Sequence, residues 1–422
     1  MMEEKNSYKV ISDLMLKSIE NNEENIVNEK CNELAEIICD FRNGEITKID
    51  AAHVRRWISQ FEDSYKIPIL EEMIYVFTEW YLKRDYILDE FIDKIPGILQ
   101  KKYNYSSEIE TCRHVSFVDI QNEGQSQKRL LSELKRLKQE QYGVSLISGI
   151  DSSITHYAYI DDGFYSGSRA RKDIKELAYQ LKPGDTLDVF YLVICVNGFL
   201  FAKKEFKELA EECKIDIKFH PLAQIENERM EHREYKDGIE TIWWMKNHMC
   251  MWPDCLSKSD PDIVRYLEQL QKCPGKCERY PFRGTHWIND EGVFSSSDRR
   301  ALVEYAFLKK GIQIANSYSE TKGMYPLGYN LWPSFGFGIL FATDYNVPNN
   351  APLVIWADKN WYPLLPRRIN NQSDVLVIED NLNYENNYLC EDYYNTCPDC
   401  GNIFGLYEDG GNGFCIDCAL GH

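Results

Sequence analysis

Three features are scarce or absent in this 422-residue sequence. No apolar run approaches the roughly 18 residues that a membrane-spanning helix needs, so we expect no transmembrane helix. The first residues, Met-Met-Glu-Glu-Lys-Asn-Ser, carry no hydrophobic signal-peptide core, so we expect a cytoplasmic protein. Positive charge is in deficit: 48 Lys and Arg against 67 Asp and Glu give a net charge of −19, which argues against a broad, non-specific nucleic-acid surface.

Apolar residues and cysteine are plentiful. With 44% hydrophobic and 13% aromatic residues, the chain can bury a substantial core over two or three domains. Fourteen cysteines without a secretion signal indicate thiols or metal ligands in a reducing compartment, because disulfides persist mainly in oxidising ones.

Residues 106–225 alternate between apolar runs and amphipathic stretches. The continuous apolar run 189–196 is typical of a parallel strand covered on both faces. The alternation predicts an α/β fold with a doubly wound parallel sheet, whose ligands lie beyond the carboxyl ends of the strands. We predict strands at residues 115–120, 143–148, 157–160, 189–196 and 215–219.

The segment 156–172 carries the most specific chemistry in the chain. An apolar run ends directly at Asp161 and Asp162, a loop of small and hydroxyl residues follows at 163–168, and a helix with apolar residues at i, i+3, i+4 and i+7 comes next. Loop amides and a helix N-terminus favour an anion, and carboxylates accept hydrogen bonds from sugar hydroxyls. The order predicts a site for a phosphorylated ribose; an ordinary strand–turn–helix with an acidic cap is the alternative.

This segment resembles the phosphoribosyl-pyrophosphate signature of the type I phosphoribosyltransferases. The resemblance implies that Asp161 and Asp162 bind the ribose hydroxyls as catalytic residues, with Mg²⁺ arriving with the substrate. Tyr165 stands where several members carry an acid or Thr. The residues that would hold the 5′-phosphate are Tyr165, Ser166, Gly167, Ser168 and Arg169.

A second loop follows the first predicted strand. By position it corresponds to the pyrophosphate loop of those enzymes, although an ordinary strand–helix turn capped by Ser126 is the alternative. Its residues are Gly124, Gln125, Ser126, Gln127 and Lys128.

We predict that residues 1–105 form a helical domain, with a winged-helix-like fold as one interpretation. A helix that begins after Asp50 carries Arg55 and Arg56, which would suit DNA reading; packing or dimerisation is the favoured interpretation.

Residues 226–300 form a cysteine-containing insertion in the 106–368 domain. A second metal site is one interpretation of the pairs Cys250, Cys255, Cys273 and Cys277, with His248 and His286 as substitute ligands; ordinary thiols are the other.

Residues 325–338 are aromatic and glycine-rich. They indicate either a hood that stacks on a base, with Asn349, Asn350 and Arg367 as polar contacts, or a rigid packed subdomain.

The order of motifs over about residues 50–368 is similar to that of phosphoribosyltransferase-like proteins of bacterial conflict systems, some of which accompany retron reverse transcriptases.

The C-terminal segment predicts a zinc ribbon at 393–422, after a linker at 369–392. Two Cys-x-x-Cys turns lie 14 residues apart, and four thiolates suit a structural Zn²⁺. The predicted ligands are Cys397, Cys400, Cys415 and Cys418. Acidic neighbours favour a protein partner for the ribbon, with nucleic acid as the alternative.

The resemblance implies an enzyme acting at the anomeric carbon of a phosphoribosyl group in antiphage defence, a transferase or a nucleotide N-glycosidase. Two alternatives stay open: a non-catalytic nucleotide sensor, and a DNA- or protein-binding adaptor. A reverse transcriptase or another defence component is the expected protein partner.

Overall fold

The computed structural model comprises two compact units, Met1–Arg367 and Arg368–His422. The structure describes residues 23–121, 126–165, 167–225, 243–244, 250–272, 282–283, 291–318, 323–330, 334–367, 394–396 and 403–405. Among these residues, no helix has the length and apolar character needed to cross a membrane.

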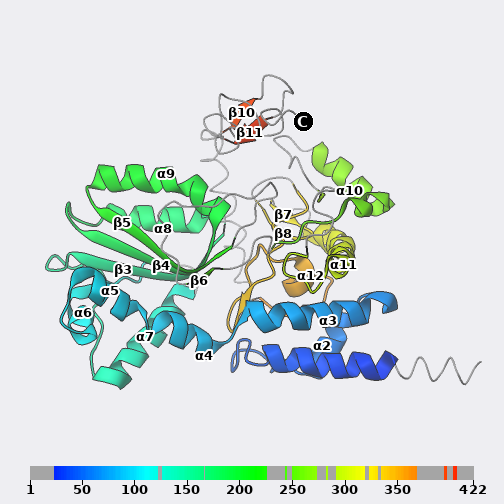
Figure 1. Cartoon of the computed structure of the whole chain (residues 1–422), viewed down its shortest axis with the longest axis horizontal. Helices are drawn as coiled ribbons and strands as arrows, with labels where there is room; N and C mark the ends of the chain where they lie inside the picture. The colour runs from blue at the N-terminus through cyan, green and yellow to red at the C-terminus, as the bar shows by residue number, and fades with distance from the viewer. Residues whose placement is uncertain are drawn as a thin grey trace, which may run out of the picture. The chain divides into compact units, whose positions relative to one another are not determined.

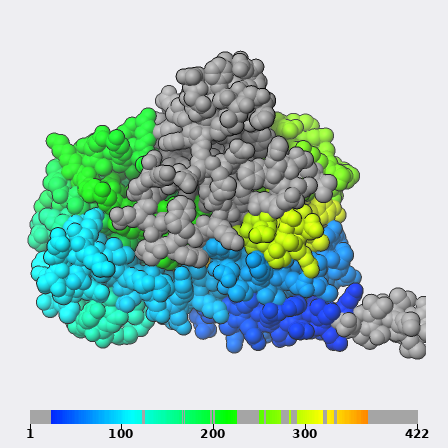
Figure 2. All heavy atoms as spheres, viewed as in Figure 1, coloured from blue at the N-terminus to red at the C-terminus, as the bar shows by residue number. Residues whose placement is uncertain are grey.

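Helices of the first 114 residues line one edge of the first unit (Figure 2). They are residues 23–38, α2 (Ala51–Ile58), α3 (Asp63–Trp80), α4 (Arg84–Ile87), the π-helical turn η1 (Leu88–Ile92), α5 (Ile95–Tyr103) and α6 (Glu108–His114), with the short strand β1 (Tyr81–Leu82) after α3.

Helix α2 packs its apolar face into the protein. Asp50 caps it by accepting a hydrogen bond from a backbone N–H at 2.9 Å, and Trp57 is fully buried. Arg55 pairs with an acidic side chain of the preceding helix, and the Arg56 guanidinium lies 4.0 Å from the centre of the Tyr362 ring. Because each arginine contacts another side chain of the protein and the apolar face of α2 is buried, the packing interpretation is favoured over DNA reading.

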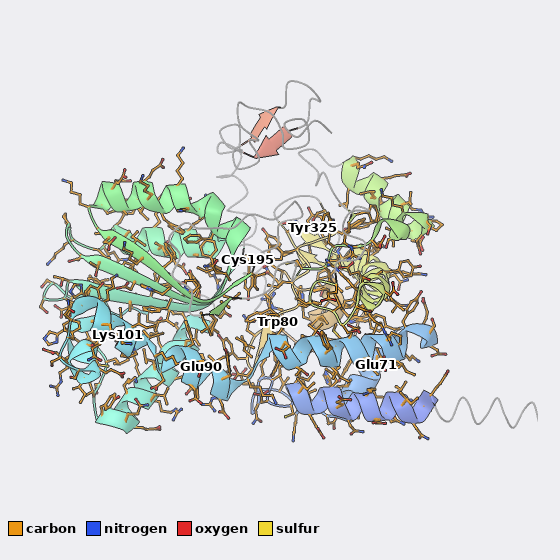
Figure 3. All side chains as sticks on the ribbon, in the orientation of Figure 1. Glu71, Trp80, Glu90, Lys101, Cys195 and Tyr325 are labelled. Carbon is orange, nitrogen blue, oxygen red and sulfur yellow. The ribbon has the colours of Figure 1, made fainter. Side chains whose placement is uncertain are left out.

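A five-stranded parallel sheet forms the centre of the α/β region (Figure 1). Its strands, in spatial order, are β2 (Val115–Phe117), β3 (His156–Phe164), β4 (Thr186–Cys195), β5 (Asp216–Ile225) and β6 (Trp243–Trp244). The predicted α/β class with a parallel sheet is confirmed. Cys195, the last residue of β4, marks its carboxyl edge in Figure 3.

The predicted strand at 143–148 is reduced to one parallel bridge, between Ile147 and Ser116 of β2. Since β2 pairs with β3 on its other side, the spatial order is residue 147, β2, β3, β4. After β2, the chain first adds residue 147 on one side of β2. It then crosses back and adds β3 on the other side. This makes the gap between the carboxyl ends of β2 and β3 the topological switch point, where doubly wound proteins bind ligands.

Helices cover both faces of the sheet (Figure 1). Helices α8 (Ser168–Ala178) and α9 (Val196–Cys213) cover the face that carries Tyr157 and Tyr159. The other face, which carries Ala158 and Ile160, packs with α7 (Ser126–Tyr142) and the N-terminal helices. The side-chain alternation along β3 therefore sends successive residues into different cores.

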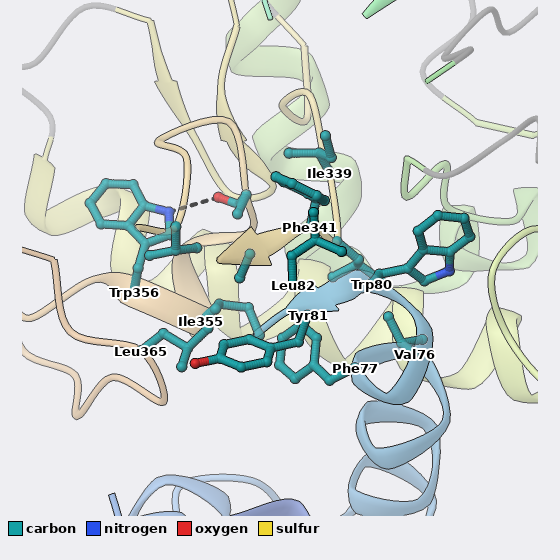
Figure 4. Close-up of a cluster of buried hydrophobic side chains, with 14 of the residues drawn as sticks. Val76, Phe77, Trp80, Tyr81, Leu82, Ile339, Phe341, Ile355, Trp356 and Leu365 are labelled. Carbon is teal, nitrogen blue, oxygen red and sulfur yellow. Dashed lines mark hydrogen bonds between the residues drawn. The ribbon is translucent and has the colours of Figure 1, made fainter. Parts of the chain in front are cut away.

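One hydrophobic core joins the N-terminal helices to residues 250–365. β1 pairs in parallel with β9 (Ala342–Thr343), and Figure 4 shows β1 packed among apolar side chains of the N-terminal helices and of residues 339–365. Phe335 is fully buried against Phe282, with ring centres 5.1 Å apart, which favours the packed-subdomain interpretation of the aromatic run. The elements of this part are η2 (Cys255–Ser259), α10 (Pro261–Gln271), α11 (Ser297–Ala315), η4 (Asn316–Tyr318), β7 (Met324–Tyr325), β8 (Gly328–Tyr329), β9 (Ala342–Thr343) and α12 (Leu353–Trp356).

In the second unit, β10 (Tyr394–Thr396) and β11 (Ile403–Gly405) form an antiparallel pair that flanks Cys397 and Cys400 in the sequence. The four predicted ribbon ligands lie outside the described residues, as do Cys273 and Cys277. Cys250 is buried. Both zinc sites and the domain boundaries stay predictions.

Candidate functional site

Asp161 is the most heavily hydrogen-bonded carboxyl group of the site. Its Oδ2 accepts from the Gln121 amide at 2.8 Å and from the Tyr159 hydroxyl at 3.1 Å. Its Oδ1 accepts from the Ser126 hydroxyl at 2.6 Å and from the Asp162 backbone N–H at 2.9 Å. These four donors come from the loop after β2, from α7 and from β3, so Asp161 joins the elements on both sides of the switch point.

A third carboxyl group, Asp173 of α8, lies against the same donors. The Gln121 amide donates to its Oδ2 at 3.1 Å, and the Tyr159 hydroxyl, whose single proton Asp173 shares with Asp161, lies 3.2 Å from the same oxygen. Burial, and next the charge of Asp161, raise the pKa of Asp173 to about 6. Two carboxyl groups bridged by shared donors form a buried acidic pair beneath the loop.

Asp162 faces away from this cluster. Burial, and next the charge of Asp161, raise the pKa of Asp162 to about 7, against the stabilising hydrogen bond from Asn346 and the positive charge of Arg169. The Asn346 amide donates to its Oδ2 at 2.7 Å. Because a carboxylate can accept about four hydrogen bonds, Asp162 retains acceptor capacity that Asp161 has largely used.

The loop after β3 is shaped by two glycines. A side-chain carbon at Gly163 would lie 2.4 Å from the Tyr165 ring, so the ring folds back over this glycine. Gly167 has φ of 77° and precedes α8 as its N-cap, with no side-chain hydrogen bond to the first turn. The first-turn N–H groups of α8 are therefore not capped by a side chain at position 167. Ser166 lies outside the described residues, and Ser168 is the first residue of α8.

Part of the predicted pyrophosphate loop, residues 126–128, forms the first turn of α7. Ser126 is bonded to Asp161, as above. The Gln127 side-chain oxygen accepts from the backbone N–H groups of Ile120 and Gln121 at 3.1 Å, and its amide nitrogen is buried without a hydrogen-bond partner. Lys128 is exposed. Gly124 and Gln125 lie outside the described residues.

Three residues near the acids were missed by sequence reasoning: Gln121, Asp173 and Asn346. Asp173 had a readable signal, because it stands on the apolar stripe of α8 with buried Ala170, Ile174 and Leu177 at helical spacing. A charged residue on such a stripe needs a polar partner. Asn346 is 184 residues from its partner and had no local signal.

Asn349, Asn350 and Arg367, the predicted base contacts, each contact another part of the chain. Asn350 is buried, and its amide donates to the Tyr329 backbone carbonyl at 3.0 Å, which makes it part of the scaffold. The Asn349 backbone carbonyl accepts from the Tyr329 N–H at 2.8 Å. The Arg367 guanidinium lies 5.1 Å from the centre of the Trp356 ring.

A doubly wound parallel sheet with buried acids at its switch point, followed by a glycine turn into a helix, is compatible with a phosphoribosyltransferase-like fold. The chain belongs to the PRTase-CE family, whose family model matches residues 54–367. This match confirms the resemblance to phosphoribosyltransferase-like proteins. No curated protein and no solved structure matches the chain.

Proposed function

We propose that this protein is a phosphoribosyltransferase-like effector that binds phosphoribosyl pyrophosphate or a nucleotide 5′-phosphate and acts at the ribosyl anomeric carbon. One observation carries the proposal: Asp162 stands near the carboxyl end of β3 at the switch point, and the Gly167 turn that opens α8 follows after residues 163–166.

Each part of this arrangement has a place in the reaction. The first-turn N–H groups of α8 suit a 5′-phosphate, whose binding energy orients the reacting carbon. Asp162 accepts from ribose hydroxyls. When ionised, it also stabilises the positive charge that develops on the sugar ring as the leaving group departs.

Mg²⁺ would arrive with the ligand. Within the described ranges, no three His, Cys, Asp or Glu side chains are grouped so that they could hold a metal ion. Mg²⁺ is commonly held by one or two carboxylates and by substrate phosphates, a set that Asp162 and a pyrophosphate would supply. Bound there, Mg²⁺ would neutralise charge on the pyrophosphate.

The resemblance to proteins of bacterial conflict systems supports a role in cytoplasmic antiphage defence, with a reverse transcriptase or another defence component as partner. The predicted Zn²⁺ ribbon would supply a contact for that protein or for nucleic acid, because its four thiolates leave no open position on the metal for catalysis.

A non-catalytic nucleotide sensor is the second candidate, and two observations favour it. Tyr165 replaces the acid or Thr of several phosphoribosyltransferases, and its ring folds over Gly163. Asp161 is bonded to four donors of the protein itself. Under this alternative the same ligand binds and no bond is broken.

Calorimetry with phosphoribosyl pyrophosphate and Mg²⁺ tests the proposal, together with an assay for pyrophosphate or free-base release from nucleotides. We expect wild type to bind, and Asp162→Asn to lose about tenfold or more in affinity, because a hydrogen bond to a charged group contributes about 1.5–3 kcal/mol. Asp162 is the cleaner target, since substitution of Asp161 would disturb four internal hydrogen bonds.

Asp216→Asn, an exposed substitution on β5, is the matched control and should bind as wild type does. Release that is abolished in Asp162→Asn supports the enzyme. Binding without release supports the sensor, and no binding by wild type refutes both.

A further inference from the structure

Helices α8 and α9 lie side by side and run parallel on one face of the sheet (Figure 1). Two contacts join them. The Arg171 guanidinium pairs with Glu205 at 2.6 Å, and the Tyr179 hydroxyl, directly after α8, donates to Glu212 at 3.1 Å. Because the two contacts are similarly spaced along both helices, each level of α8 has a matching level on α9.

The exposed charges of this helix pair change sign at one such level. On α8 the lysines come before Glu176, and on α9 they come before Glu208, Glu211 and Glu212; all these side chains are exposed. The basic half lies beside the Arg171–Glu205 contact and the acidic half beside the Tyr179–Glu212 contact. We call the exposed lysines of the basic half the lysine face: Lys172, Lys175, Lys203, Lys204 and Lys207.

Helix stability does not account for this order of charges. The N-terminus of a helix favours acids, and the C-terminus favours bases. The first turn of α8 has no acid and carries Arg169 and Arg171, and the last turn of α9 has no base and carries Glu211 and Glu212. Within the lysine face, Lys175 alone stands in a last turn, where the dipole favours it. The pattern is therefore better explained by a partner than by folding.

The lysine face keeps positive charge available to a partner. Within the described ranges, Lys172, Lys204 and Lys207 make no salt bridge. Elsewhere on the surface, Lys66 and Lys94 pair with acids one helical turn away. The chain has 67 acids for 48 bases, so acidic partners are plentiful. A cluster of lysines that leaves them unused favours an anion from outside the chain.

We propose that the lysine face is a docking surface for nucleic acid, which it contacts through the phosphate backbone. Small-molecule sites are concave, whereas these side chains stand on the outward side of two helices. Backbone phosphates are bound by lysine side chains at a surface and need no cavity. Such contacts carry no sequence information, so binding should be independent of base sequence.

A membrane surface is the competing partner, and two observations disfavour it. Among the large hydrophobic side chains described on α8 and α9, the exposed one is Tyr179, which lies beside the acidic half, so the lysine face offers no apolar group for insertion. A flat anionic bilayer would also meet the acidic half, whereas a strand can follow the lysines alone. The inference goes beyond the proposed function and does not depend on it, because it uses none of the residues assigned to the sugar or its phosphate.

Fluorescence anisotropy of the full chain tests the inference, with a labelled single strand of about 20 nucleotides and the matching duplex, at about 50 mM and about 200 mM salt. We expect wild type to bind at least one form and to lose about 20-fold or more in affinity at the higher salt. Combining Lys172→Gln, Lys204→Gln and Lys207→Gln should lower the low-salt affinity about tenfold or more. The slope of log affinity against log salt should fall by about 2–3, because three phosphate contacts are lost.

The matched control combines Lys48→Gln, Lys83→Gln and Lys101→Gln, which removes the same charge from exposed positions outside the lysine face. It should stay close to wild type in affinity and in slope. Three outcomes overturn the inference: no binding of either form by wild type at low salt, an equal loss in both variants, or wild-type binding by the lysine-face variant. Vesicles that contain phosphatidylserine test the membrane, and wild type that binds them and neither nucleic acid overturns the inference in favour of a lipid surface.

Discussion

At the scale of single residues, Asp162 lowers the stability of the ligand-free protein at neutral pH. Its folded-state pKa of about 7 exceeds the ordinary value of 3.8. Between these values the unfolded chain releases the proton and the folded chain keeps it, so folding stability falls as pH rises through this window. Asp162→Asn removes this penalty, and we expect it to raise stability at pH 8 by about 1–3 kcal/mol, with little gain at pH 4.

Calorimetric unfolding of wild type and Asp162→Asn at the two pH values measures this effect, with Asp216→Asn as the control. A gain that is larger at pH 4 than at pH 8 would contradict the raised pKa. A variant that is more stable and binds no ligand would show that the acid is retained for function at a cost in stability.

Sequence reasoning identified the site residues that lie close together along the chain. Asp161, Asp162 and Gly167 follow in order, and local spacing was enough to indicate the strand, the acids and the helix. Asn346 arrives from a segment whose position depends on the β1–β9 pairing. No periodicity records such a pairing, because it is set by packing between segments far apart in the sequence.

At the scale of elements, Asp188 ties β4 to its neighbours on one face of the sheet. It is fully buried and binds Lys102 and Tyr103 of α5 and His220 of β5. Burial alone would raise its pKa, yet the hydrogen bonds from His220 and Lys102 and the charge of Lys102 hold the pKa below its ordinary value. We expect Asp188→Ala to destabilise the protein by about 3–5 kcal/mol, because it leaves buried polar partners unpaired.

Urea unfolding measures the loss in Asp188→Ala, and exposed Asp119→Ala should stay within about 0.5 kcal/mol of wild type. A near-neutral Asp188→Ala would mean that water replaces the lost carboxylate. Stability that depends on this ionised group should also fall as pH drops below about 4, since its pKa is lower in the folded state.

At the scale of the whole molecule, the long-range core explains which boundaries the sequence does not reveal. Trp57 and Phe77 stand on helical stripes that would suit a separate N-terminal bundle. In the structure they share one core with Phe307 and Trp356. An apolar stripe shows that a helix is covered and does not show which segment covers it. A change in composition therefore marks where the linker and the cysteine-rich end begin. No such change marks a boundary between the N-terminal helices and the sheet.

The division into two units leads to a prediction about metal. If Cys397, Cys400, Cys415 and Cys418 bind zinc, the full chain should carry about one structural Zn²⁺ in the second unit. Replacing Cys397 and Cys400 with Ser should remove it. The unfolding temperature of the first unit and its affinity for ribose 5-phosphate should not change, because these ligands lie in the other unit. Elemental analysis and calorimetry of the purified protein measure both outcomes. Full zinc content in the double variant would place the metal elsewhere, with Cys250 and its neighbours as the next set to replace.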